Sequence, residues 1–310
     1  MTSLTARSSA SPSQITPHFA VRSAAVALIT GGGSGIGLAI AEHLINTHGY
    51  RVVILDVNKE RGEAEAKRLN VADNCLFKQV DVTDFDQQAQ AFQQTCEWGG
   101  GRLDMFVANA GIGDGDSVYK DLKGVDEKTG LPKPVDLRTL DVNLNAVIQG
   151  VHLARHFFLR NKSPGGKIVI TSSCLGVYAN HSLPLYSASK HALVGFVRST
   201  APVFAGMDIT INALLPVLIE TNLMPEAVRP LWDRAQLTPL STVSKAIDSI
   251  MDAKTTGQTI ELSLDQTVFS KQQAFSTPNA KWMCEQHKLW EMACEPLLPK
   301  PPGQNVGELQ

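Results

Sequence analysis

Tyr186 and Lys190 are the residues of this chain whose types and spacing best suit catalysis. They lie four residues apart where apolar positions recur at helical spacing, so both side chains would project from one helix face. A free tyrosine loses its proton near pH ~10, and an ammonium group one turn away lowers that pKa. Such a pair suits proton transfer to or from an alcohol or carbonyl oxygen. The alternative is a buried tyrosine beside a surface lysine, because a lone Tyr-x-x-x-Lys occurs often by chance.

Ser173 comes just before this segment, after an apolar run that begins at Ile168. The run is short and rich in Ile and Val, which predicts a buried strand ending in hydroxyl residues. The Ser173 hydroxyl could therefore hydrogen-bond a substrate oxygen and hold it against the phenol.

A glycine-rich turn follows the first predicted strand. The strand covers Val26 to Thr30, the turn is Gly31-Gly-Gly-Ser-Gly35-Ile-Gly37, and apolar residues at helical spacing come next. Glycines let the backbone approach a pyrophosphate, and a helix N-terminus offers it free N–H groups. The order strand, glycine turn, helix therefore predicts a dinucleotide site.

Asp56 ends the second predicted strand, Arg51 to Asp56, 19 residues after Gly37. A carboxylate there accepts hydrogen bonds from the adenosine ribose hydroxyls and repels a 2′-phosphate. Ser34 adds no positive charge to the turn, and we interpret Lys59 and Arg61 as a solvated helix start. NAD is therefore predicted as the cofactor rather than NADP.

Strands alternate with helices along the rest of the chain. Cys75 to Thr83 predicts a third strand that places Asp81 under the adenine, while Asp84 suits the N-cap of the next helix better. Further strands are predicted over 103–111, 208–216 and 258–263. This alternation predicts an α/β fold: a single-domain, doubly wound parallel sheet, Rossmann-like, with helices on both faces and a ligand crevice at the strand C-terminal ends.

Three other segments bear on the site. Residues 112–137 are rich in glycine and proline and predict a loop beside the crevice. Residues 140–159 predict a helix that is apolar on nearly all faces, hence buried or in a subunit interface, with Asn143 either a satisfied core amide or part of the site. Residues 217–240 predict either an amphipathic lining for a hydrophobic substrate or plain core packing.

The amino-acid composition limits the kinds of partner and site that we expect. The chain has 310 residues, 43% of them hydrophobic, with 28 Lys plus Arg against 30 Asp plus Glu, so we expect no nucleic-acid partner. No apolar run reaches the ~18 residues of a transmembrane helix, so no membrane partner is expected. Scattered cysteines predict free thiols and a cytoplasmic protein without disulfides or a metal site. They are Cys75, Cys96, Cys174, Cys284 and Cys294.

The predicted domain organisation has three parts. Residues 1–22 are rich in Ser, Thr and Ala and predict a disordered tail, with an organellar transit peptide as the alternative. Residues 23–268 form the dinucleotide-binding catalytic domain, and 269–310 form a C-terminal extension.

Taken together, these motifs resemble the short-chain dehydrogenase/reductase family over roughly residues 24–265. The resemblance rests on one ordered set: Thr30-Gly-x-x-x-Gly35-x-Gly37, Asp81-Val82, Asn109-Ala-Gly111, Asn143, Ser173, Tyr186-x-x-x-Lys190 and Pro216 with Thr221. Tyr186 to Ser199 and the aspartate at 56 look most like the NAD-dependent 15-hydroxyprostaglandin and 5′-hydroxyaverantin dehydrogenase branch, whose members oxidise secondary alcohols.

The resemblance implies a catalytic tetrad and a homodimer or homotetramer. Tyr186 would be the base or acid, Lys190 would tune it and hold the nicotinamide ribose, Ser173 would orient the substrate, and Asn143 would order a proton-relay water. The implied cofactor-binding set is Gly31, Ser34, Gly35, Ile36, Gly37, Asp56, Asp81, Val82, Asn109, Tyr186, Lys190, Val217 and Thr221.

One departure from the family concerns Val217, which stands where the family usually has glycine. A β-branched residue adopts positive φ only at a cost, so we expect the nicotinamide loop to follow another path. The first functional hypothesis is an NAD-dependent dehydrogenase oxidising a hydrophobic secondary alcohol to a ketone. The alternatives are a carbonyl reductase, a non-redox lyase or cyclase, and a protein that binds dinucleotide without turnover.

Overall fold

The computed structural model describes residues 24–71, 73–224, 226–251 and 254–294. The chain divides into two compact units, Met1–Ser270 and Lys271–Gln310. The tail predicted over residues 1–22 lies outside the described residues. Within the described part of the chain, no helix combines the length and apolar character needed to cross a bilayer.

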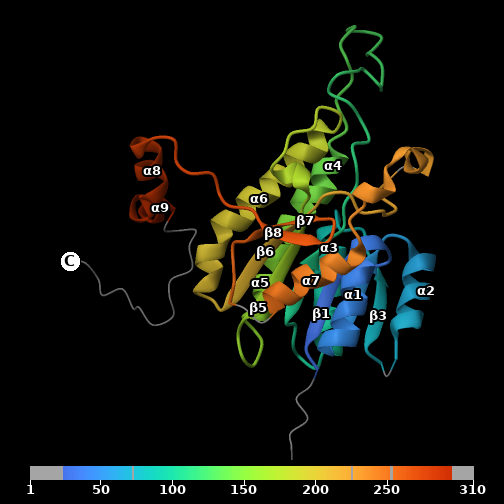
Figure 1. Cartoon of the computed structure of the whole chain (residues 1–310), viewed down its shortest axis with the longest axis vertical. Coiled ribbons are helices and arrows are strands. Elements are labelled where there is room, and N and C mark those ends of the chain that lie inside the picture. The colour runs from blue at the N-terminus through green and yellow to red at the C-terminus, as the bar shows by residue number, and fades with distance from the viewer. Residues whose placement is uncertain (1–23, 72, 225, 252–253, 295–310) are drawn as a thin grey trace, which may run out of the picture. The chain divides into compact units, whose positions relative to one another are not determined.

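An eight-stranded sheet forms the centre of the first unit, in the order β3-β2-β1-β4-β5-β6-β7-β8 (Figure 1). All neighbours pair in parallel except β7 and β8, which are antiparallel. The strands are β1 (Val26–Thr30), β2 (Arg51–Asp56), β3 (Cys75–Gln79), β4 (Met105–Ala108), β5 (Gly166–Thr171), β6 (Ile209–Pro216), β7 (Thr259–Ser263) and β8 (Gln266–Phe269). The doubly wound sheet is confirmed, and its strand order reverses between β1 and β4, where such sheets bind ligands.

Helices cover both faces of this sheet. One face packs against α1 (Gly35–His48), α2 (Lys59–Leu69) and α7 (Leu240–Met251), and the other against α3 (Phe85–Trp98), α5 (Ala146–Phe158) and α6 (Pro184–Ala205). Successive residues of a strand point to opposite faces, so Val26 and Leu28 join one core while Ala27 and Ile29 join the other. Burial on both faces explains why β1 is an unbroken apolar run.

The single helix predicted over 140–159 is interrupted in the structure. A short α4 (Arg138–Leu140) leads into a π-helical turn, Asp141–Asn145, before α5 begins. The Ala146 N–H donates to the carbonyl of Asp141, five residues back, which defines the π pattern. Hydrophobic periodicity could not reveal this turn, because it inserts one residue without breaking the apolar pattern.

The structure also contains elements that the sequence patterns did not predict. Strand β8 adds an antiparallel edge next to β7, because a tight reversal at Leu264 (φ 53°) turns the chain back. The second compact unit contains α8 (Pro278–Glu285) and α9 (His287–Cys294). Thr277 caps α8 by accepting a hydrogen bond from the Ala280 N–H.

Candidate active site

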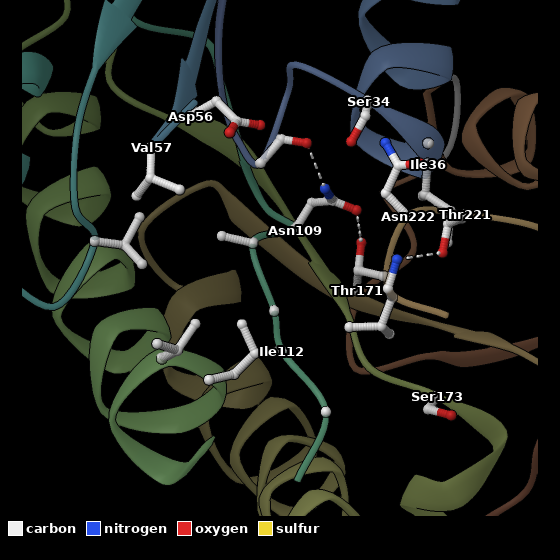
Figure 2. Close-up of a pocket in the computed structure, with 18 of the residues that line it drawn as sticks. Ser34, Ile36, Asp56, Val57, Asn109, Ile112, Thr171, Ser173, Thr221 and Asn222 are labelled. Carbon is white, nitrogen blue, oxygen red and sulfur yellow. Dashed lines mark hydrogen bonds between the residues drawn. The ribbon is translucent and has the colours of Figure 1, made fainter. Parts of the chain in front are cut away.

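A cleft of about 480 Å³ opens at the C-terminal ends of the strands, at the reversal between β1 and β4 (Figure 2). Its walls come from the glycine turn, the ends of β2, β4, β5 and β6, and the first turn of α6. Most of the residues predicted to bind cofactor or substrate line it: Gly31, Ser34, Gly35, Ile36, Asp56, Asp81, Val82, Asn109, Ser173, Tyr186, Lys190, Val217 and Thr221. Gly37 and Asn143 do not.

The glycine turn leaves the N-terminus of α1 open to the cleft. Gly35 has φ +55°, which favours glycine, and a Cβ on Gly37 would lie 2.3 Å from the Gly31 carbonyl oxygen. Ser34 is extended and makes no side-chain hydrogen bond to the helix. The first N–H groups of α1 therefore have no side-chain cap, which suits a pyrophosphate. Gly37 allows close packing of the turn against the Gly31 carbonyl and Asn109, and its contact with a cofactor stays a prediction.

Asp56 is buried at the end of β2 and its carboxylate is held in place. One oxygen accepts from the Gly33 N–H at 3.1 Å, and the other accepts from the Asn58 N–H at 2.9 Å. Arg61 reaches this second oxygen at 3.5 Å and also lines the cleft. Arg61 lies in the first turn of α2 and its side chain is 38% exposed, which agrees with the predicted helix start. The guanidinium nevertheless folds back onto Asp56, a contact that the sequence pattern did not predict.

Asp81 and Asp84 have different hydrogen-bond partners in the structure, and the predicted place of Asp81 under the adenine stays a prediction. Asp84 caps α3 by accepting from the Gln87 N–H at 3.0 Å, which confirms that prediction. Asp81 lines the cleft and accepts from the backbone N–H and the hydroxyl of Thr83, at 3.0 and 2.7 Å. These two hydrogen bonds, the backbone one first, lower the pKa of Asp81.

Asn109 ties three neighbouring strand ends together. Its amide donates to the carbonyls of Thr30 and Gly31, each at 3.1 Å, and its oxygen accepts from the Thr171 hydroxyl at 3.0 Å. These bonds join the loops after β1 and β4 to the end of β5 beneath the cleft floor. Asn109 therefore fixes the shape of the cleft, and its own amide hydrogen-bonding groups are already used.

Asn143 lies in the π-helical turn and is fully buried. Its side-chain oxygen accepts from the Ile112 N–H, its amide donates to the Ile112 carbonyl, both at 2.8 Å, and a third bond reaches Ser189. Of the two alternatives for this residue, the satisfied core amide describes its side chain. That side chain holds the loop after β4, and the predicted role of Asn143 in ordering a water stays a prediction.

Lys190 lies beneath Tyr186 on α6 and is almost completely buried. Its Nζ donates to the Thr171 carbonyl at 2.9 Å and lies 5.4 Å from the centre of the Tyr186 ring. Burial lowers the pKa of Lys190 to about 8. The side chain is therefore directed into the cleft floor at the end of β5, as a ribose-binding or proton-tuning group would be.

Tyr186 departs from the predicted titration. Burial of the phenol raises its pKa above the ordinary 10.0, while its interaction with Ser173 acts in the opposite direction. The net direction is therefore opposite to the lowering that the Tyr186–Lys190 spacing predicts, because desolvation of the phenol is the largest cause.

Asp114 is a residue of the site that the sequence patterns missed. Its carboxylate accepts from the backbone N–H of Tyr186 at 2.6 Å and of Leu185 at 3.1 Å. Helix α6 has no side-chain cap at Leu183, so Asp114 supplies one from the loop after β4. No local pattern marks this contact, since the two partners are 71 and 72 residues apart.

The segment after β6 forms the remaining wall. Val217 lines the cleft with its N–H bonded to the Leu262 carbonyl at 3.0 Å, and it is not among the residues with positive φ. Val217 therefore avoids the left-handed conformation, as expected of a β-branched residue, and the different path of the nicotinamide loop stays a prediction. The lining continues to Leu223, whereas Leu231 is 80% exposed, so only the first part of the predicted 217–240 lining reaches the cleft.

Comparison with known proteins agrees with this geometry. The family model described as short chain dehydrogenase matches residues 25–231. The short-chain dehydrogenase/reductase prx6 of Penicillium rubens is 32% identical over 243 residues, covering 76% of this chain and 79% of that protein. The 15-hydroxyprostaglandin dehydrogenase (NAD+) of Homo sapiens is 33% identical over 205 residues, covering 64% and 70%. A crystal structure of 3-ketoacyl-(acyl-carrier-protein) reductase from Brucella melitensis, complexed with NADH, aligns with TM-score 0.64 and 26% identity over 77% of this chain and 96% of that one.

Proposed function

Because the chain belongs to the short-chain dehydrogenase family of oxidoreductases, we propose that it oxidises a hydrophobic secondary alcohol to a ketone, with NAD as cofactor. One observation carries the proposal: Ser173, Tyr186 and Lys190 share a single cleft with the open N-terminus of α1. The name of the human relative, a hydroxyprostaglandin dehydrogenase that uses NAD, supports both the reaction class and the cofactor.

The residues of the cleft fit a dinucleotide along its length. The glycine turn and the α1 N-terminus would hold the pyrophosphate, Asp56 the adenosine ribose, and Lys190 the nicotinamide ribose. Bound NAD supplies the hydride acceptor. Side chains of the protein would orient the substrate and accept its proton.

Tyr186 is the proposed proton acceptor. Ser173 would orient the substrate hydroxyl by hydrogen bonding, and the Tyr186 oxygen would take the hydroxyl proton as the carbonyl forms. Val142, Val217 and Leu223 give the cleft an apolar wall, which supports a hydrophobic substrate.

Carbonyl reduction is the second candidate, and one observation favours it. Because burial raises the pKa of Tyr186, the phenol is protonated at neutral pH and suits proton donation to a ketone. The solved reductase that aligns with this chain supports the same direction. Initial rates of alcohol oxidation and of ketone reduction, each measured across a range of pH, distinguish the dehydrogenase from the carbonyl reductase.

The cofactor preference depends on the balance between Asp56 and Arg61. The buried carboxylate supports NAD, because it would repel a 2′-phosphate. Arg61 is the residue that could attract one, since its Nε is buried and makes no hydrogen bond within the described residues. Measuring kcat/KM with NAD and with NADP tests the choice directly.

The experiment that tests the proposed function is a substrate panel. The purified protein is incubated with NAD and a series of aromatic and aliphatic secondary alcohols, and reduced cofactor is followed by absorbance. We expect turnover that improves with the apolar size of the alcohol. Dinucleotide binding without turnover in either direction, over the whole panel, would contradict an enzymatic role.

We further propose a homodimer or homotetramer in the cytoplasm. The exposed apolar side chains of Ile148, in the first turn of α5, and Leu159, directly after this helix, support an interface there. The thiols of Cys75, Cys96, Cys174 and Cys284 are free, which supports a reducing compartment. Light scattering after size-exclusion chromatography tests the assembly, and a monomeric mass at micromolar concentration would contradict it.

A further inference from the structure

His43, His48 and Asp248 come together on the outer side of α1 and α7, and none of them lines the cleft. The two helices pack against each other on one face of the sheet (Figure 1). The Nε2 atoms of His43 and His48 lie 2.6 and 2.8 Å from the same carboxylate oxygen of Asp248. The three potential ligand atoms all lie within 4.8 Å of one another.

We propose that His43, His48 and Asp248 form a binding site for a divalent transition-metal ion, with Zn²⁺ as the best match. Two imidazole nitrogens and one carboxylate oxygen are a donor set that Zn²⁺ accepts, with bonds of about 2.0–2.2 Å. Tetrahedral ligands at that length stand roughly 3.3 Å apart. The two histidine–carboxylate separations, 2.6 and 2.8 Å, are shorter than this value, so side-chain rotations that move the carboxylate away from the imidazoles would seat the ion.

The orientation of the rings supports a shared ion. The two imidazoles approach edge to face, with centroids 5.2 Å apart and planes at 79°, and both direct Nε2 to one point. The side chains of His43 and His48 are 14% and 21% exposed, whereas that of Asp248 is 49% exposed. The ligands are therefore held by packing on one side, while the carboxylate side is open for ion entry and a coordinated water.

The second contact of His43 suits a metal ligand. Its Nδ1 lies 3.3 Å from the hydroxyl of Thr47. When Nε2 binds a metal, Nδ1 carries the proton and the hydroxyl oxygen can accept it, as outer-shell partners of ligating histidines do. When Nε2 carries the proton instead, the same hydroxyl can donate. The Thr47 hydroxyl can therefore hydrogen-bond His43 whether or not the proposed site holds an ion.

The local charge also favours a cation. His48 is the last residue of α1, and Asp248 lies in the last turn of α7, so two helix C-termini with their partial negative charge meet at this point.

An ion at this site would connect α1 and α7, both of which join segments that line the cleft. Helix α1 carries the glycine turn at its other end, and α7 follows the segment that contributes the Val217 wall. Because the ligands come from both helices, the ion would stabilise the fold without taking part in the reaction. A ligand that binds only the folded state raises Tm, by roughly 5 °C at a hundredfold excess over Kd for a domain of this size.

Zinc titration of the full chain tests the proposal. After treatment with EDTA and dialysis, ZnCl₂ is added in calorimetry and in thermal unfolding, and CoCl₂ is added to record visible absorption. We expect one ion per chain, a rise in Tm of about 5 °C, and a cobalt spectrum typical of four-coordination. The absence of saturable binding of either ion at micromolar concentration would overturn the proposal.

Two variants locate the ion. His48→Gln keeps a hydrogen-bond donor toward Asp248 but removes a good zinc ligand, so it should fold like the parent chain and lose the Tm rise. His152→Ala is the matched control, because His152 and His156 stand one turn apart on α5 and offer a rival surface pair. Loss of zinc binding in His152→Ala, with binding retained in His48→Gln, would place the ion on α5 and refute the site.

Discussion

Replacing Asp114 tests whether a loop residue positions Tyr186, the proposed proton acceptor. Its carboxylate accepts two backbone N–H groups of the first turn of α6, at 2.6 and 3.1 Å, and no side chain caps that helix at Leu183. Removing a helix cap costs about 0.5–2 kcal/mol, and a hydrogen bond to a charged acceptor contributes about 1.5–3 kcal/mol. For Asp114→Ala we therefore expect a loss of about 2 kcal/mol in unfolding free energy, a fall in Tm of roughly 4–8 °C.

The same change should reduce activity in a characteristic way. Tyr186 is one of the two residues whose N–H groups are released, so its phenol would shift relative to Ser173. Small displacements of a reacting group can cost up to ~100-fold in rate. We expect kcat to fall at least tenfold while KM for the dinucleotide changes little, because the glycine turn is untouched.

Asp126→Ala is the matched control for this experiment. Asp126 lies in the same loop, and its replacement removes the same charge. Its carboxylate accepts from the N–H groups of Lys128 and Thr129 in its own turn. Chemical denaturation and steady-state kinetics are measured for both variants. An Asp114→Ala enzyme with kcat and stability like those of Asp126→Ala would refute the positioning role.

Three further predictions concern the cofactor, the pH profile and the glycine turn. Asp56→Ala should weaken NAD by about tenfold and NADP less, since each lost charge-assisted bond contributes about 1.5 kcal/mol; a parent enzyme that already prefers NADP would contradict this. Because the pKa of Tyr186 is raised above 10.0, kcat/KM for oxidation should rise about tenfold per pH unit between about pH 6 and 9 as the phenolate fraction grows, whereas a flat profile would exclude this base. Gly37→Ala should abolish dinucleotide binding in calorimetry, because its Cβ would lie 2.3 Å from the Gly31 carbonyl oxygen; Gly195→Ala, whose Cβ would meet nothing within 4 Å, should bind normally and gain up to about 1 kcal/mol in stability.

Short-range sequence patterns predicted the elements whose residues are consecutive in the chain. The run Val26–Thr30, the glycines after it and the helix starting at Gly35 are consecutive, so their order alone predicted the nucleotide end of the cleft. Asp84 was recognised as a cap because its acceptor role depends on a residue three positions away. The doubly wound sheet followed from the same alternation.

The misses share a physical cause, which is contact between distant segments. Asp114 reaches α6 only because the tertiary fold brings the loop after β4 against the start of that helix, 72 residues further along the chain. The pKa of Tyr186 depends on how deeply the ring is buried, and a spacing of four residues carries no information on burial. Asn143 was left open for the same reason, since its partner Ile112 lies 31 residues away.

The most direct test of the account is Tyr186→Phe, assayed for NAD binding and for turnover on the same sample. The phenylalanine ring fills the same space, so the cleft and its glycine turn should remain intact. We predict that NAD binds within about twofold of the parent affinity while alcohol oxidation falls by at least ~100-fold, the contribution expected of a positioned proton acceptor. Turnover close to that of the parent enzyme would contradict the central claim that this phenol carries the proton.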